Sequence, residues 1–148
     1  MLNDDHGLNI AIGTDLVEIE RFRNLEAESP FYKRVFSERE LAYCHGYSDP
    51  APHIAATFAG KEAIVKATNS NCSVSLNKIE ILRDENGAPF VILHQNCNYD
   101  IHLSLTHSSS HAVAVALAVH QSHVSDMNAI REKMAAVLKQ ILPGRAVS

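Results

Sequence analysis

Eight consecutive apolar residues, Ala112 to Val119, constrain the fold of this chain more than any other feature. The run is too short to cross a bilayer, which takes about 20 residues. Its alanines and valines instead predict a strand at the centre of a sheet, buried on both faces. Upstream, residues 101–106 alternate apolar and polar side chains, which is typical of a strand with one buried face. The polar turn 107–111 connects these two expected strands.

Three further strands are expected. Residues 8–12 alternate enough to form a first strand near the N-terminus. Residues 79–83 and 90–94 predict a hairpin, because the Asn86-Gly87 step between them favours a tight turn.

The segment from His53 to Thr68 predicts a long central helix. Ser37 and Glu40 have the spacing of a capping box, which opens a second helix. A further helix is expected to end before Ser29-Pro30, and the apolar spacing of the tail predicts an amphipathic helix. These shorter helices are expected over residues 16–25, 38–44 and roughly 123–142.

Together these elements comprise a small antiparallel-rich sheet and a long central helix. At 148 residues the chain can bury one ordinary core. We expect one main domain over residues 1–120 and a C-terminal helical extension over residues 121–148.

The composition argues against several classes of protein. Thirteen Lys+Arg against 17 Asp+Glu give a net charge of −4, which offers no electrostatic footprint for nucleic acid. The polar, acidic start Met1–Gly7 is unlike a secretory signal, and no run reaches membrane-spanning length, so we expect a cytoplasmic protein. Cys44, Cys72 and Cys97 are odd in number and lack metal-site spacing, which favours reduced, buried thiols.

The residues that could carry chemistry lie far apart in sequence. Asp15 follows Gly13-Thr14, read as a turn, so it would face a cleft at the end of the first strand. Glu62 and Lys66 are four residues apart and project from one face of the central helix. Two acids and a lysine suit Mg²⁺ holding a polyphosphate, because this cation binds one or two carboxylates and leaves room for phosphate oxygens. The plainer alternatives are a helix N-cap for Asp15 and a solvated ion pair for Glu62 and Lys66.

Five segments, taken together and in this order, indicate a function more clearly than any one of them does alone. In sequence order they are Ile12–Arg21, Arg34–Cys44, Phe58–Ala67, Asn86–Pro89 and Leu103–Ser108. Together they resemble the holo-acyl-carrier-protein synthase family of 4'-phosphopantetheinyl transferases. The resemblance covers about residues 9–119, so the expected main domain would be catalytic. It implies the α+β fold of the 4'-phosphopantetheinyl transferases, with a small antiparallel-rich sheet, a long central helix and, in this chain, an extra C-terminal helix.

Enzymes of that family move the phosphopantetheine arm of coenzyme A onto a serine of an apo acyl carrier protein and release adenosine 3',5'-bisphosphate. The resemblance implies that Asp15 and Glu62 bind Mg²⁺ and that Lys66 contacts the phosphates. It leaves the general base open between Glu62 and a water on the metal. Glu18 would either assist through water or be a plain surface acid.

Other matched positions concern the substrates. Gly87, Pro89, His107 and Ser108 match the loops that hold the adenine and its 3'-phosphate. Arg21 matches the position that docks the acidic carrier, with a solvated helix charge as the plainer interpretation. The family is typically a homotrimer with each active site at a subunit boundary, which the resemblance implies here.

Two departures from the family pattern keep other functions open. Thr57 stands where relatives usually carry an arginine, and residues 69–73 replace a glycine-rich loop. These departures motivate an alternative, a non-catalytic module that binds coenzyme A or a carrier. Hydrolysis of a coenzyme or nucleotide pyrophosphate at the same metal site is a third hypothesis.

Overall fold

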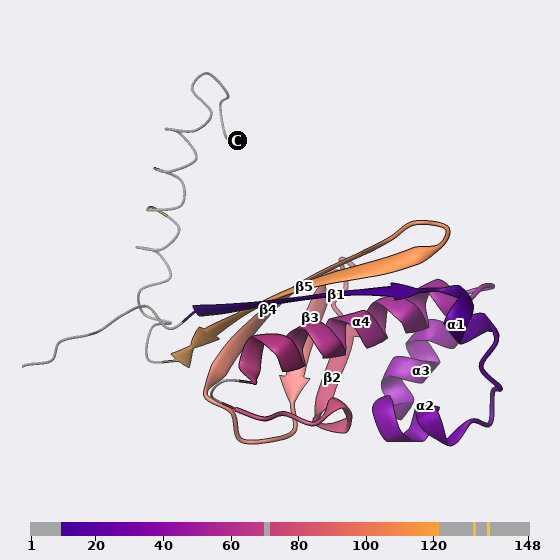
Figure 1. Ribbon diagram of the computed structural model, residues 1–148, viewed down its shortest axis with the longest axis horizontal. Coiled ribbons are helices and arrows are strands. Elements are labelled where there is room, and N and C mark those ends of the chain that lie inside the picture. The colour runs from indigo at the N-terminus through magenta and orange to yellow at the C-terminus, as the bar shows by residue number, and fades with distance from the viewer. Residues whose placement is uncertain (1–9, 70–71, 122–131, 133–135, 137–148) are drawn as a thin grey trace, which may run out of the picture.

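The computed structural model describes residues 10–69, 72–121, 132 and 136 (Figure 1). Its helices are α1 (Glu20–Arg23), α2 (Pro30–Val35), α3 (Glu38–His45), α4 (Ala51–Thr68) and the 3-10 helix η1 (Leu76–Lys78). Its strands are β1 (Ile10–Glu18), β2 (Ile79–Arg83), β3 (Pro89–Leu93), β4 (Tyr99–His107) and β5 (His111–His120).

The strands form two antiparallel sheets, one of order β1-β5-β4 and one made of the β2–β3 hairpin. The long helix α4 lies along one face of the larger sheet, and α1, α2 and α3 gather at one end of it (Figure 1). This architecture confirms the α+β prediction. The apolar run from Ala112 is confirmed as the central strand, since β5 pairs with β1 on one side and β4 on the other.

Alternation along β5 explains how α4 comes so close to the sheet. Its four alanines are completely buried on the side that faces α4: Ala112, Ala114, Ala116 and Ala118. The larger Val113, Val115 and Leu117 point to the opposite face. Small residues under the helix let the two backbones approach, while the bulky apolar residues are left on the outer face.

The predicted turn at Gly13-Thr14 is wrong, because β1 continues through both residues to Glu18. Gly13 is required for a different reason. A Cβ there would collide with the carbonyl oxygen of Ala63 and lie 2.7 Å from the Ala67 nitrogen, both in α4. Glycine inside a strand often marks such a close backbone approach.

The helix predicted over residues 16–25 is also wrong in extent, because β1 takes its first residues and only α1 is helical. Ser29-Pro30 starts a helix instead of ending one. Ser29 is the N-cap of α2, with its hydroxyl accepting from Phe31 N, and Pro30 occupies the first turn, where its missing N–H costs nothing. The capping box of Ser37 and Glu40 is confirmed.

Smaller differences concern the ends of elements. Helix α4 begins two residues earlier than predicted, and β3 begins at Pro89, one residue earlier. Cys44 is buried as expected, whereas Cys72 and Cys97 are half-buried; all three are free thiols. The predicted C-terminal helix lies almost entirely outside the described residues, and the domain boundary near residue 120 stays a prediction. In the described part of the chain, no helix has the length and hydrophobicity to span a membrane.

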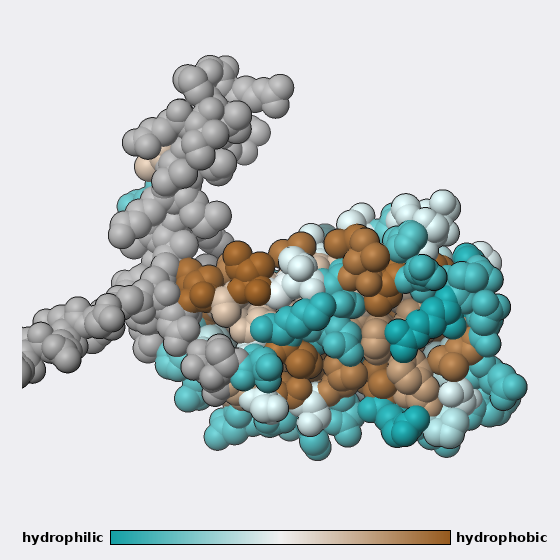
Figure 2. Space-filling view, viewed as in Figure 1, coloured by the Kyte–Doolittle hydropathy of each residue, from teal (hydrophilic) through white to brown (hydrophobic). Residues whose placement is uncertain are grey.

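The outer face of the larger sheet carries exposed apolar side chains. Ile12 and Leu16 of β1 are 68% and 62% exposed, and Val115 of β5 is 43% exposed. Hydrophobic side chains are visible at the top of the space-filling view, where Figure 1 shows β1 and β5 (Figure 2). Exposed apolar patches of this kind often mark contact surfaces.

Candidate active site

Two side chains that are far apart in the sequence, Asp15 and Lys66, meet where α4 crosses β1. Lys66 Nζ donates to Asp15 Oδ1 at 2.7 Å and to the carbonyl of Thr14 at 2.9 Å. The Asp15 side chain is 14% exposed and that of Lys66 is 52% exposed. Glu62 is half-buried one helical turn before Lys66. We call Asp15, Glu62 and Lys66 the carboxylate–lysine group.

The alternation of β1 sets this geometry. Asp15 shares the inner face of the strand with Gly13 and Val17, so it points toward α4. Gly13 brings the strand against Ala63, within one turn of the residues that Asp15 faces. Glu18 lies on the opposite, exposed face and is not brought into the group.

The donor set of this group suits a hard cation. Two carboxylates come from facing elements, and carboxylate oxygen is what Mg²⁺ accepts. Among residues 10–69 and 72–121, no cluster of three or more His, Cys, Asp or Glu side chains could hold a metal. A cation at Asp15 and Glu62 would therefore need most of its remaining ligands from water or from a bound phosphate.

A second group forms at the far end of the β2–β3 hairpin. Arg83 pairs across the hairpin with Pro89, and its Cζ lies 5.0 Å from the centre of the Tyr43 ring. The Tyr43 ring is 6.0 Å from that of His53, which is 5.8 Å from that of His107. The structure thus connects Pro89 and His107, two sequence-predicted positions, through three residues that the sequence analysis missed.

Tyr47 completes this second group, which we call the arginine–imidazole group (Tyr43, Tyr47, His53, Arg83 and His107). Its ring stacks on His53 at 3.5 Å between centroids. Burial lowers the pKa of His53, and the nearby His107 and Arg83 lower it further. Of these five residues the sequence analysis identified His107 alone, and Tyr47 lies beyond the end of α3 at His45, so no helical spacing pairs it with Tyr43.

Gly87 and Ser108, the other predicted nucleotide contacts, have clear local roles in their turns. Gly87 has φ of +81°, a conformation that favours glycine, in the turn closed by Asp84 and Ala88. The Ser108 hydroxyl accepts from the backbone nitrogens of Ser110 and His111. Both residues therefore shape the loops in which the sequence analysis expected a nucleotide.

Arg21 is exposed, and its guanidinium also contacts aromatic rings. Its guanidinium lies 5.2 Å from the centre of the Phe58 ring, 5.6 Å from that of Phe22 and 5.9 Å from that of Phe31. Cation–π contacts of this kind fix the direction of an arginine. Arg21 therefore presents a positive charge at a defined position beside α1.

The two groups are separated along α4. His53 lies nine residues before Glu62 and 13 before Lys66 in this helix, which at 1.5 Å per residue is about 14–20 Å. Asp15 and His107 come from β1 and β4, the two edges of the sheet, about 10 Å apart. A ligand that touches both groups of one copy would have to span this separation.

Comparison with known proteins places this chain in a class. The sequence model of the 4'-phosphopantetheinyl transferase superfamily matches residues 11–118. A holo-[acyl-carrier-protein] synthase of Thermoanaerobacter sp. (strain X514) is 36% identical over 122 residues, covering 76% of this chain and 88% of that protein. One from Caldicellulosiruptor saccharolyticus is 39% identical over 115 residues, covering 72% and 94%.

The fold agrees with that match. The solved ACPS–CoA complex of Chronobacterium ammoniagenes superposes with a TM-score of 0.66 at 26% identity, covering 76% of this chain and 98% of that one. The fold is thus that of an α+β transferase in which a long helix packs on an antiparallel sheet. This chain belongs to the holo-[acyl-carrier-protein] synthase family of the 4'-phosphopantetheinyl transferase superfamily.

Proposed function

We propose that this protein transfers the 4'-phosphopantetheine arm of coenzyme A to a serine of an apo acyl carrier protein. The contact between Lys66 and Asp15 carries the proposal, because it joins the β1 carboxylate to the helical turn that begins at Glu62. Relatives named holo-[acyl-carrier-protein] synthase support the carrier as acceptor, and the ACPS–CoA complex supports coenzyme A as donor.

The chemistry is a phosphoryl-type transfer. The serine oxygen forms a bond to the β-phosphorus of the donor pyrophosphate, while the bond from that phosphorus to the departing adenosine 3',5'-bisphosphate breaks. The serine proton goes to a base. Glu62 is the candidate base from this chain, half-buried at the edge of the site, with a water molecule as the alternative.

Asp15 and Glu62 would hold Mg²⁺, and the fit rests on two carboxylates from facing elements beside a single lysine. When bound, Mg²⁺ neutralises pyrophosphate oxygens and so lowers the barrier to transfer. Lys66 carries the charge that pairs with a phosphate oxygen. Its half-exposed side chain can turn from the Asp15 carboxylate toward a phosphate without disturbing the core.

The arginine–imidazole group is the proposed nucleotide end of the donor site. Pro89 begins β3 and His107 ends β4, in segments that match the family's nucleotide side, and Arg83 adds a cation beside Pro89. Gly87 and Ser108 shape the two turns. The aromatic rings offer stacking surfaces for adenine, and Arg83 offers a charge for its phosphate.

Both ends of one donor are best supplied by two neighbouring copies, because the two groups of one copy are separated along α4. We therefore propose a homotrimer whose active sites lie between subunits. The exposed Ile12, Leu16 and Val115 on the outer face of the sheet support it as the surface through which copies associate. A cytoplasmic location remains a prediction from the sequence.

Arg21 is the proposed contact for the acidic carrier. Its guanidinium is held over three phenylalanine rings, one of them Phe58 of α4, so it offers a positive charge in a fixed direction. A fixed charge gives orientation and speeds association with an acidic partner.

The alternative is a binding module without turnover, and Thr57 is the observation that favours it. Thr57 is buried in α4, where its hydroxyl lies 4.0 Å from the Cys44 sulfur. This position therefore adds no cation for coenzyme phosphates. Asp15, Glu62 and Lys66 are all present, however, which supports the transferase over the module.

One incubation separates these functions. The protein is mixed with an apo carrier, coenzyme A and Mg²⁺, and the carrier is weighed by mass spectrometry. Transfer adds the mass of one phosphopantetheine arm. Binding of coenzyme A without that gain supports the module, and cleavage of coenzyme A with an unmodified carrier supports the hydrolase.

A further inference from the structure

The helix that carries Glu62 and Lys66 has almost no polar face. Thirteen of the 18 residues of α4 are buried, and they point in all directions around the helix axis. A helix that is apolar all round has no hydrophobic stripe to decide which side faces its neighbours. Burial alone therefore does not fix the rotation that turns Glu62 toward Asp15.

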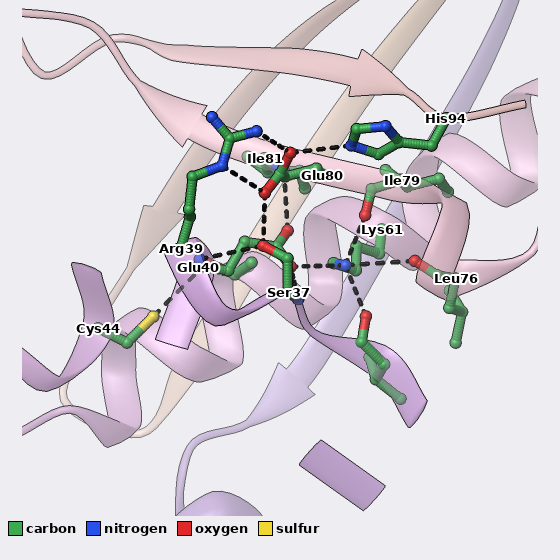
Figure 3. Close-up of polar contacts among 12 residues, drawn as sticks. Ser37, Arg39, Glu40, Cys44, Lys61, Leu76, Ile79, Glu80, Ile81 and His94 are labelled. Atoms are coloured by element: carbon green, nitrogen blue, oxygen red, sulfur yellow. Dashed lines mark hydrogen bonds and ion pairs between the residues drawn. The ribbon is translucent and has the colours of Figure 1, made fainter. Parts of the chain in front are cut away.

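Lys61 is a charged residue in the middle of this apolar surface, and its side chain has no exposed area. Its Nζ donates to the carbonyls of Val35 at 2.6 Å, Ile79 at 2.6 Å and Leu76 at 3.2 Å, and lies 2.8 Å from Glu40 Oε2. Four segments, α2, α3, η1 and β2, thus converge on one ammonium (Figure 3). Burial lowers the pKa of Lys61, while Glu40 acts to keep it charged.

Glu40 is itself held from two sides. Its Oε1 accepts from Ile81 N at 2.7 Å, and its Oε2 accepts from Ser37 N at 2.7 Å as part of the capping box. Ser37 donates its hydroxyl to the neighbouring Glu80 at 2.6 Å. The carboxylate that binds Lys61 therefore has a fixed position relative to β2 and to the start of α3 (Figure 3).

Helical geometry relates this contact to the carboxylate–lysine group. Successive residues of a helix are about 100° apart, so Lys61 and Ala63 point to nearly opposite sides and Glu62 points between them. Ala63 abuts Gly13 on one flank, and Lys61 is bound on the other. Gly13 sets the distance between α4 and β1, and Lys61 opposes any turning of α4 at that contact.

We propose that Lys61, through Glu40, is a positioning residue that sets the rotation of α4 and so the direction of Glu62 and Lys66. A buried ion pair is weak support for stability, and defining a unique packing arrangement is the best-attested use of one. Catalytic groups must be held to within about 0.5 Å and 10–20° of their productive geometry. The effect on activity rests on the proposed function, but the effect on the helix does not.

The test uses Lys61→Met, which keeps a long side chain and removes the charge. Its crystal structure, superposed on β1, β5 and β4, is expected to show α4 rotated by more than about 10°, with Glu62 and Lys66 displaced from Asp15. In the transfer assay kcat is expected to fall at least about tenfold, since a 1 Å misplacement can cost more than that. The KM for the carrier should stay unchanged.

Ile64→Val is the matched control, because Ile64 is a fully buried residue of the same helix. It loosens the core without touching the ion pair and should leave rotation and kcat unchanged. If Lys61→Met does not fold, Glu40→Gln replaces it, since it keeps the shape of Glu40 and removes its charge. An unrotated α4 in the variant that folds would overturn the proposal. If wild-type protein transfers no arm, the proposed function fails, while the measured rotation still decides the role of Lys61.

Discussion

Lys66 of α4 and Asp15 of β1 form an ion pair at 2.7 Å although 51 residues separate them in the chain. The contact is possible because Gly13 lets β1 lie against the same helix. Both side chains are reachable from solvent, so a phosphate can replace the Asp15 carboxylate as the partner of Lys66. The ion pair therefore brings the β1 carboxylate and the α4 lysine together at one place on the surface.

Lys66→Met should weaken donor binding. The charged hydrogen bond to a phosphate contributes about 1.5–3 kcal/mol, so the KM for coenzyme A should rise roughly 10- to 100-fold. Stability should change by less than about 1 kcal/mol, because the ion pair is half-exposed. Lys78→Met removes an exposed lysine from η1 and serves as the control in the same assay. An unchanged KM for Lys66→Met would remove Lys66 from the donor site.

Gly13→Ala should destabilise the protein and slow transfer together. The added Cβ collides with the Ala63 carbonyl, so β1 and α4 must separate, at a cost of about 1–3 kcal/mol in the free energy of unfolding. Urea unfolding measures the first effect and the carrier assay the second. Gly46→Ala is the control, because its nearest new contact is 3.2 Å away and a much smaller loss is expected. Equal losses for the two variants would argue against the close approach.

Acid stability should depend on Glu80. Burial alone raises the pKa of this carboxyl, but hydrogen bonds from Arg39, Ser37 and His94 outweigh burial and lower the pKa to about 2, from an ordinary value of 4.5. The folded state therefore holds this proton less tightly than the unfolded chain. The resulting stabilisation, about 3 kcal/mol, is present above pH 4.5 and is lost as the pH falls toward 2.

Unfolding measured at several pH values tests this prediction. Glu80→Gln should be less stable than wild type at neutral pH, and its free energy of unfolding should fall less as the pH is lowered from 5 toward 2. Glu38→Gln changes an exposed acid of α3 and should keep the wild-type profile. A Glu80→Gln profile parallel to that of wild type would contradict the account.

Much of the fold was readable from local pattern. The apolar run of β5, the capping box of α3 and the shared face of Glu62 and Lys66 depend on neighbouring residues, and the first two are confirmed. Gly13 was misread as a turn residue. Glycine is needed there because a side chain would collide with Ala63, which lies 50 residues later in the chain. Only the folded chain reveals such an approach.

Other site residues were hidden for the same reason. Lys61 reads as a surface charge in the sequence, yet its acceptors are carbonyls from α2, η1 and β2 that no local pattern predicts. Arg83 and His53 come together across three elements. Sequence spacing pointed to Glu62 and Lys66 of α4 as candidates, and only tertiary contacts show what holds that helix in place.

Assembly can be tested by mixing two inactive variants. Asp15→Asn disables the carboxylate–lysine group, and Arg83→Glu disables the arginine–imidazole group. If each active site takes one group from each of two copies, mixed assemblies contain some sites with both groups intact, and activity returns after unfolding and reassembly of the mixture. No recovery in the mixture would favour sites built within one copy.

Surface disruption gives an independent reading of the same proposal. Leu16→Asp introduces a charge into the exposed apolar face and should convert trimers to monomers in light scattering, with loss of transfer. Asp100→Asn, an exposed change on β4, is the control and should remain trimeric. A wild-type protein that is monomeric and active would contradict the trimer.

The central claim is tested most directly by the mass of an apo carrier after incubation with coenzyme A, Mg²⁺ and wild-type, Asp15→Asn, Glu62→Gln or Glu18→Gln protein. Glu18 lies on the opposite face of the strand that carries Asp15, so its variant is the matched control. We predict that wild type and Glu18→Gln add one phosphopantetheine arm to the carrier. The Asp15→Asn and Glu62→Gln variants, shown to be folded by their circular dichroism spectra, should add it at least about 100-fold more slowly. Full-rate addition by folded Asp15→Asn or Glu62→Gln would contradict the account.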